Sequence, residues 1–203
     1  MTLALIDYGA GNLQSVKNAL KASGADDVAV TADPDVVANA DRIVLPGVGA
    51  FAHCMSALSD IDGMVAAMEI RVLKGGVPFL GICVGMQLLA DAGVEHGTTQ
   101  GLGWIGGTVR SIEPQPNIKV PHMGWNDVTL GATHPVLAAG EAYFLHSYYF
   151  EALDVADVLA TTSHGEALTA AVGRDNILGV QFHPEKSQAY GLATLKRFLE
   201  WRP

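Results

Sequence analysis

Cys83 stands where a chain exposes a nucleophile. It lies in "VPFLGICVGMQLLADAG" (residues 77–93), between Gly81 and Gly85, after an apolar run typical of a strand and before one typical of a helix. This layout matches the nucleophile elbow, in which a sharp strand-to-helix turn presents the reactive side chain. We predict a helix over residues 84–91, whose dipole would favour a thiolate at its N-terminus. The alternative is a buried cysteine that only fills the core.

A base for this thiol is found in "GVQFHPEKS". His183 follows an apolar strand, and Glu185 comes two residues later. Pro184 favours an extended conformation for His183, and residues i and i+2 of an extended chain project to the same side. Glu185 would then hold one imidazole nitrogen while the other faces the thiol, as in acyl transfer by a nucleophile, a base and an orienting acid. The alternative is a surface histidine beside a solvated glutamate.

An oxyanion site is expected from two backbone segments. "VLPGVGAF" (residues 44–51) is a glycine-rich loop after a strand, and N–H groups around Val48 and Gly49 would supply one donor. The N–H of Val84, next to the nucleophile, would supply the other. The loop lacks the Lys-Ser/Thr of a Walker motif, so a phosphate site is the weaker interpretation. A purely structural turn is the other alternative.

The elements that must position these residues alternate between strand and helix patterns. "LALID", "DVAVT", "RIVLPG" and "VPFLGI" read as strands, with helical spacing between them. This pattern predicts an α/β fold with an open, largely parallel sheet, and short β-rich runs from Gly97 onward predict added antiparallel strands. Chemistry in such sheets gathers at the carboxyl ends of the strands. With no linker or repeat, residues 1–203 are expected to form a single domain.

Composition excludes several function classes. The 203 residues are 49% hydrophobic and 16% charged, with a net charge of −9 and a pI near 5.1. An acidic chain is a poor partner for nucleic acid or an anionic membrane. Neither the two cysteines nor any histidine pair has metal-ligand spacing, so we expect no metal. No signal peptide or membrane span is visible, and a cytoplasmic protein is expected.

Together, these segments resemble the class-I, or triad, glutamine amidotransferases. The family's G-x-C-x-G-x-Q elbow is matched by "GICVGMQ" and its H-P-E motif by "FHPEKS". The resemblance covers nearly the whole chain and implies a flavodoxin-like open sheet, with Cys83, His183 and Glu185 as the triad. It implies hydrolysis of L-glutamine to L-glutamate and ammonia, without a cofactor.

The same resemblance assigns the substrate pocket. Gln87 and Glu95 resemble the positions that grip the amino-acid end of glutamine, and a carboxylate suits an ammonium group. Ser147 and Tyr148 resemble the wall that holds the substrate by backbone contacts. The alternatives are solvated helix-end residues for the first pair and an aromatic core strand for the second.

Further segments are similar to the glutaminase subunits of imidazole glycerol phosphate synthases, which serve histidine biosynthesis. They are "IDYGAGNLQSV", "LPGVGAF", "GLGWIGG", "VPHMGWN" and "YFLHSYY". This likeness implies a heterodimer with a cyclase subunit, a TIM-barrel protein that uses the ammonia to make imidazole glycerol phosphate and an aminoimidazole carboxamide ribotide. The positions that resemble partner-facing ones are Asn12, His122, Met123, Trp125, Asn126 and Lys186. Core packing is the alternative for Trp125.

Two other classes stay open at this stage. A free-standing cysteine hydrolase of γ-glutamyl compounds would use the same triad without a partner surface. A non-catalytic binding module would keep the fold without the chemistry.

Because a glutaminase without an acceptor wastes glutamine, we expect low activity of the chain alone and stimulation by the liganded partner.

Overall fold

A computed structural model of the chain describes residues 1–116 and 118–203. In these residues the strands form a nine-stranded sheet and a four-stranded sheet. The strands of the larger sheet are β1 (Thr2–Ile6), β2 (Asp27–Thr31), β3 (Arg42–Gly47), β4 (Phe79–Cys83), β8 (His122–Leu130), β9 (Gly140–His146), β11 (Val158–His164), β12 (Glu166–Arg174) and β13 (Ile177–Val180). Those of the smaller sheet are β5 (Ala92–Gly93), β6 (Thr99–Gln100), β7 (Gly107–Ser111) and β10 (Tyr148–Ala152).

The larger sheet has a parallel half and an antiparallel half. Its order is β2-β1-β3-β4-β13-β12-β11-β8-β9. Strands β2 to β13 in this order pair in parallel, and the pairs from β13 to β9 are antiparallel. The predicted α/β sheet with added antiparallel strands in the second half is therefore confirmed.

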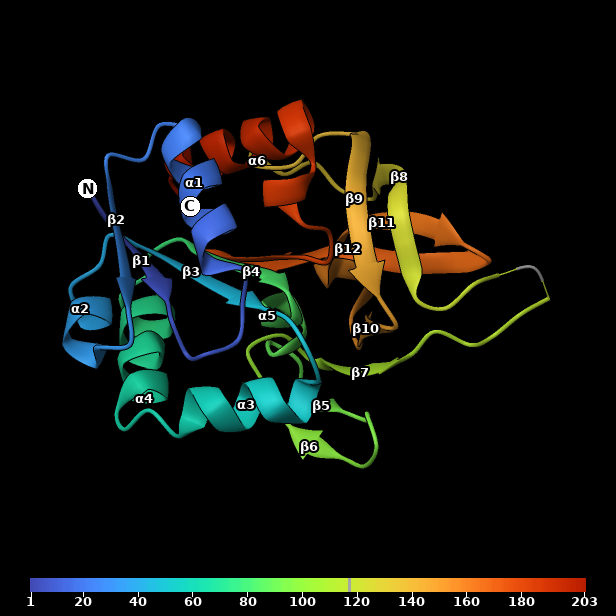
Figure 1. The fold of residues 1–203 in the computed structure, drawn as a ribbon, viewed down its shortest axis with the longest axis horizontal. Helices are drawn as coiled ribbons and strands as arrows, with labels where there is room; N and C mark the ends of the chain where they lie inside the picture. Colours follow the sequence, from blue (N-terminus) through green and yellow to red (C-terminus); the bar gives the residue numbers. More distant parts are fainter. Residues whose placement is uncertain (117) are drawn as a thin grey trace.

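Helices cover both faces of the parallel half. In Figure 1, α1 and α6 lie above this part of the sheet, and α3 and α4 lie below it. The helices are α1 (Leu13–Ala22), α2 (Pro34–Ala38), α3 (Phe51–Ser59), α4 (Met64–Glu69), α5 (Val84–Gln87) and α6 (Gln188–Glu200), with a π-helical turn at Ile70–Lys74 and 3₁₀ turns at Val155–Asp157 and Pro184–Lys186. Among the residues described, no helix is long and apolar enough to span a membrane.

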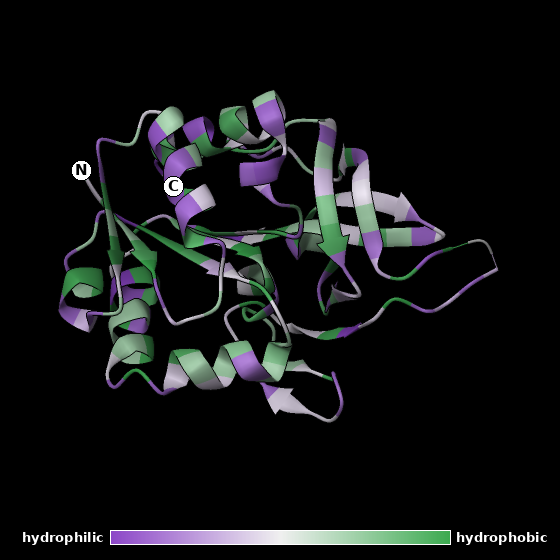
Figure 2. Ribbon diagram, viewed as in Figure 1, coloured by the Kyte–Doolittle hydropathy of each residue, from purple (hydrophilic) through white to green (hydrophobic). Residues whose placement is uncertain are grey.

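The double cover explains the sequence of the central strands. Every residue of β3, β4 and β13 is buried, as expected for parallel strands with helices on both faces. Figure 2 shows this hydrophobic centre in green between more polar helix surfaces. Local signals set the helix ends: the Asp33 side chain accepts a hydrogen bond from the Asp35 N–H at 2.9 Å, which caps α2 as its sequence predicts.

The helix expected over residues 84–91 is the clearest error of the sequence analysis. Helix α5 ends at Gln87, and the chain continues in 3₁₀-type turns. Leu89 and Ala90 donate to the carbonyls three residues back, those of Met86 and Gln87, at 3.1 and 3.0 Å. The Asp91 N–H, which a longer helix would direct to the Gln87 carbonyl, donates to the Gly107 carbonyl at 3.0 Å instead. The carbonyls of Leu88 and Leu89 accept from Leu102 and Trp104 in the following loop, which satisfies the end of this short helix.

The order of the strands brings the two halves of the expected triad together. Strands β4 and β13 are parallel neighbours, with Val180 paired to Ile82. Cys83 is the last residue of β4, and His183 follows the end of β13. Two residues a hundred positions apart in the sequence, 83 and 183, therefore meet at one carboxyl edge of the sheet.

Candidate active site

Cys83 sits on a strained turn between β4 and α5. Its φ and ψ are 55° and −113°, an unusual conformation for a residue other than glycine. Such strain is typical of a nucleophile elbow, since the sharp turn lifts the side chain off the sheet. The Cys83 side chain lines a pocket, although the residue as a whole is only 4% exposed.

Glycines let the elbow lie directly against the neighbouring backbone. A Cβ on Gly85 would overlap the carbonyl oxygen of Leu45 in β3. A Cβ on Gly47 would lie 2.7 Å from the Gly85 nitrogen. At both glycines, the neighbouring backbone occupies the space that a side chain would need. This contact explains why glycine follows Cys83 in the G-x-C-x-G motif.

We expect Gly85→Ala to destabilise the protein severely. The added methyl group meets backbone rather than a movable side chain, so the cost should reach about 3 kcal/mol or more. Urea unfolding measures the loss. The matched control is Gly106→Ala, whose Cβ would meet only ordinary contacts at 3.5 Å or more. Equal stability of the two variants would contradict this account of the elbow.

His183 and Glu185 form a buried pair beside the elbow. His183 Nδ1 lies 2.9 Å from Glu185 Oε1, and the two side chains are 3% and 2% exposed. The backbone of His183 is fixed as well, since its carbonyl accepts from the Ser187 hydroxyl at 2.7 Å and its N–H donates to Tyr143 at 2.9 Å. With Nδ1 engaged, Nε2 is the nitrogen left for the thiol of Cys83.

The charge state of His183 follows from its neighbours. Burial lowers the pKa of His183, but Cys83 and Glu185 more than offset this effect and raise it to about 9. At neutral pH the imidazole is therefore protonated, and it can donate a proton to a leaving group.

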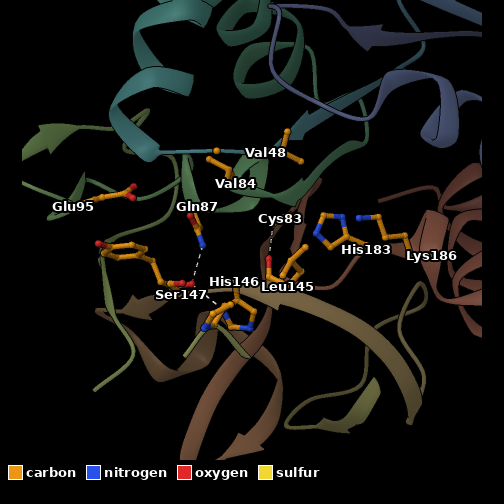
Figure 3. Close-up of a pocket in the computed structure, with 13 residues that line it drawn as sticks. Val48, Cys83, Val84, Gln87, Glu95, Leu145, His146, Ser147, His183 and Lys186 are labelled. Atoms are coloured by element: carbon orange, nitrogen blue, oxygen red, sulfur yellow. Dashed lines mark hydrogen bonds between the residues drawn. The ribbon is translucent and has the colours of Figure 1, made fainter. Parts of the chain in front are cut away.

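The pocket at the elbow has a volume of about 310 Å³. Figure 3 shows Glu95 at one end and His183 with Lys186 at the other, while Gln87 and Ser147 lie between them. The residues expected to bind substrate all line this pocket: Gln87, Glu95, Ser147 and Tyr148. One of the two Glu95 oxygens, Oε2, accepts a hydrogen bond from the Phe51 N–H at 2.8 Å, which also places this carboxylate at the start of α3.

Gln181 is a site residue that the sequence analysis missed. It is fully buried, its Nε2 lies 3.7 Å from Cys83 Sγ, and its Oε1 accepts from Gln87 Nε2 at 3.0 Å. Gln87 Nε2 also donates to the Tyr148 carbonyl at 2.9 Å. An amide in the otherwise apolar run "ILGVQF" was the available signal. Gln181 thus connects the thiol, through Gln87, to the Tyr148 carbonyl in the pocket wall.

The loop expected to complete the oxyanion site lies beside the elbow, because Gly47 pairs with Cys83 in the register of β3 and β4. Burial raises the pKa of Cys54, which therefore stays a thiol, and its Sγ donates to the Val48 carbonyl at 3.4 Å. The C=O and N–H of a trans peptide point in opposite directions, so the Gly49 N–H points away from α3. Gly49 has a φ of 104°, which favours glycine. Val48, Gly49 and Val84 line the same pocket as Cys83.

The residues expected to face a partner divide into two groups. Met123 and Trp125 point outward from β8 and are 65% and 47% exposed, and Asn12 and Lys186 are also exposed. His122 is only 3% exposed and Asn126 is half-buried, because even-numbered residues of this part of β8 face inward. The expectation that His122 contacts a partner is therefore wrong for its side chain.

Among the described residues, no group of three or more His, Cys, Asp or Glu side chains is arranged to hold a metal ion. Both cysteines are free thiols. The groups available for chemistry in the pocket are a thiol, an imidazolium and backbone N–H groups.

The sequence matches the family described as "Glutamine amidotransferase class-I" over residues 4–200. The chain belongs to the class-I glutamine amidotransferase family. Its elbow, histidine and glutamate stand where the motifs of that family led us to expect them.

Relatives within the family are close in sequence. The chain is 65% identical over 206 residues to the imidazole glycerol phosphate synthase subunit HisH of Zymomonas mobilis, an alignment that covers 100% of this chain and 97% of that protein. It is 53% identical over 214 residues to the HisH subunit of Rhodospirillum rubrum, with both chains fully covered. A crystal structure of a glutamine amidotransferase has a TM-score of 0.77 at 20% identity and covers 98% of both chains, which supports the fold.

Proposed function

We propose that this chain is the glutaminase subunit of an imidazole glycerol phosphate synthase. It hydrolyses L-glutamine to L-glutamate and ammonia, and a cyclase subunit uses the ammonia for L-histidine biosynthesis. The observation that carries the proposal is the pocket in which Cys83, the His183–Glu185 pair and a candidate oxyanion loop converge. The 65% identity to a HisH subunit over the full chain supports the synthase rather than another amidotransferase.

The first half of the reaction cleaves the amide. Glutamine binds with its side-chain carbonyl carbon at Cys83 Sγ and its ammonium group toward Glu95 and Gln87. The thiolate adds to the carbonyl carbon, and N–H groups of Val84 and Gly49 bind the oxyanion. His183, protonated at neutral pH, gives its proton to the departing nitrogen, which leaves as ammonia.

The second half releases glutamate. His183, now neutral, takes a proton from water as the water attacks the γ-glutamyl thioester. The collapse of this second tetrahedral intermediate breaks the C–S bond and returns the thiolate. Glu185 keeps Nδ1 in place throughout, so Nε2 serves both proton transfers.

The partner surface that we propose is the outer face of β8 and β9. Register places Met123 opposite Leu145 and Trp125 opposite Tyr143. Lys186 Nζ lies 5.9 Å from the centre of the Tyr143 ring. This apolar face with a basic edge adjoins the pocket, because Leu145 and Lys186 also line it. The position suits a partner that receives ammonia directly from the site.

With two free thiols, the chain suits the reducing cytoplasm.

Glutamate release tests the proposal. The chain is assayed alone, with a cyclase subunit, and with the cyclase and its nucleotide substrate. We expect low release alone and strong stimulation in the liganded complex. High release that ignores the cyclase would identify a free-standing γ-glutamyl hydrolase instead. No release under any condition, with no reaction of Cys83 with a glutamine-like electrophile, would indicate a non-catalytic module.

Trp125→Ala should weaken cyclase binding without harming the fold. Trp125 is 47% exposed in the chain alone, and removing a central aromatic anchor typically costs about 2 kcal/mol, or roughly 30-fold in Kd. Calorimetric titration of the cyclase with each variant measures the loss. The matched control is Leu153→Ala, which removes an 84% exposed apolar side chain after β10. Equal affinities of the two variants would refute the assigned surface.

A further inference from the structure

Two buried histidines lie at the glutamine pocket, and the proposed mechanism uses neither: His146 is among the residues that line the pocket, and His122 contacts His146. His122 of β8 and His146 of β9 are paired in the strand register and are 3% and 6% exposed. His122 Nδ1 lies 3.0 Å from His146 Nε2. Their other nitrogens are also engaged: His146 Nδ1 lies 2.9 Å from the Tyr148 carbonyl oxygen, and His122 Nε2 lies 3.0 Å from Asn126 Nδ2.

The partners determine where the protons are. A carbonyl oxygen only accepts, so His146 Nδ1 carries the hydrogen, and in a neutral ring Nε2 must then accept. His122 therefore donates from Nδ1 and accepts at Nε2. The atom facing that nitrogen is the Asn126 amide, which is a donor, and Asn126 Oδ1 accepts from the Asp127 N–H at 2.8 Å. Each hydrogen bond in this series is thus donated in the direction from Asn126 to the Tyr148 carbonyl. Both imidazoles are neutral.

A proton added to either ring would break this order. Protonated His146 would turn an Nε2–H toward the Nδ1–H of His122, and protonated His122 would turn an Nε2–H toward the Asn126 amide. Two further histidines oppose such a charge: His164 of β11 stacks on His122 with ring centres 4.2 Å apart, and His183 faces His146. Burial, the largest cause, lowers the pKa of His122 to about 4 and that of His146 to about 3.

The two ends of the chain of hydrogen bonds lie at places with different functions. At one end, the Tyr148 carbonyl accepts from both His146 and Gln87, whose amide also reaches Gln181 next to Cys83. At the other end, Asn126 Nδ2 also donates to the Ser163 carbonyl at 2.8 Å. Met123 and Trp125, on the opposite face of the same strand, form the proposed partner surface.

We propose that His122 and His146 are positioning residues for the glutaminase reaction: as two neutral imidazoles they hold the Tyr148 backbone in the glutamine pocket and connect it to the strand that bears the partner surface. The inference rests on the proposed function. Neither ring touches the reacting atoms, so the expected effect is on glutamine recognition and not on the reactivity of the thiol.

Inactivation of Cys83 by two reagents separates recognition from reactivity. The full chain, in complex with the cyclase, is treated with a diazoketone analogue of glutamine, which needs the pocket, and with iodoacetamide, which needs only the thiolate. His122→Phe keeps a flat ring between Phe144 and His164 but removes both nitrogens. His122→Asn keeps an amide donor near the position of Nδ1 and serves as the conservative control.

We expect His122→Phe to raise the half-saturating concentration of the glutamine analogue about tenfold, because His146 Nε2 loses its donor. His122→Asn should stay within about threefold of the original chain. Iodoacetamide should react at the same rate in all three proteins. The proposal is overturned by an unchanged value in His122→Phe, by equal losses in both variants, or by a parallel loss of iodoacetamide reactivity. If the original chain shows no saturable inactivation, the proposed function itself has failed.

A measurement on the unaltered protein covers the case in which a variant does not fold. Nitrogen-15 NMR of the imidazoles at neutral pH should show His122 and His146 both neutral, with the hydrogen on Nδ1 and none on Nε2. The opposite tautomer, or a protonated ring, at either residue would overturn the proposal.

Discussion

Cys83→Ala is expected to abolish glutamate release, by a factor on the order of 10⁴ or more. Without the thiol no γ-glutamyl thioester forms, so neither half of the proposed reaction can proceed. The fold should persist, because the side chain only reaches the Leu145 carbonyl at 3.9 Å and Gln181 at 3.7 Å. Steady-state glutamate release with the cyclase and its substrate bound measures the loss.

The other thiol provides the control for this substitution. Cys54→Ala removes a buried side chain that donates to the Val48 carbonyl and does not reach the reacting atoms, so its effect should remain below about tenfold. If Cys54→Ala matched Cys83→Ala, or if Cys83→Ala kept substantial turnover, the assignment of the nucleophile would be wrong.

Glu185→Gln should lower turnover by roughly 10³-fold while the protein stays folded. The carboxylate does two things for His183: it accepts from Nδ1 at 2.9 Å, and it stabilises the imidazolium by its charge. In the variant, the amide oxygen can still accept a hydrogen bond from Nδ1, but the side chain carries no charge to stabilise the imidazolium. In the described residues the other oxygen, Oε2, is buried without a hydrogen-bond partner, so an amide NH₂ placed there would also be unsatisfied. The control is Glu200→Gln at the exposed end of α6.

The pH dependence of stability gives a second, independent measure of this pair. The pKa of His183 is about 9 in the folded protein, above its ordinary 6.5, so the folded state holds this proton more tightly than the unfolded state does. The stabilisation is fully present below pH 6.5 and is lost as the pH rises toward 9. Urea unfolding should show a smaller loss over this interval in Glu185→Gln than in the unaltered chain. Identical pH profiles would contradict the role of the Glu185 charge.

The sequence was most informative where chemistry restricts the choice of residues. The elbow needs glycines on both sides of Cys83 because backbones touch there, and the pair His183–Glu185 needs two fixed positions after a strand. The parallel half of the sheet was also predictable, since strands such as β3 and β4 contain continuous apolar runs and end at glycine-rich turns. These signals are local, so each can be recognised without knowing which segments of the chain pack against it.

What the sequence could not predict depends on neighbours far along the chain. Helix α5 ends early because the Asp91 N–H donates to the Gly107 carbonyl rather than to Gln87, and the loop at residues 101–105 then binds the carbonyls that follow the helix. The burial of His122 follows from the register of β8 against β9. The alternation in "HMGWN" is misleading, because the usual pattern would bury Met123 and Trp125, which are the exposed residues. Gln181 lay in a run that reads as an ordinary apolar strand. Its role emerges only once Gln87 and Cys83 lie beside it.

The pocket wall at Ser147 and Tyr148 lies where the chain leaves one sheet for the other. Strand β9 ends at His146 in the large sheet, and β10 begins at Tyr148 in the small one, with Ser147 between them. The wall therefore belongs to both sheets. A small shift of one sheet relative to the other would change the pocket without breaking the hydrogen bonds between the strands of either sheet. Substitutions in β7, which pairs with β10, would therefore reach this wall through the smaller sheet, without a direct contact to the outer face of β8.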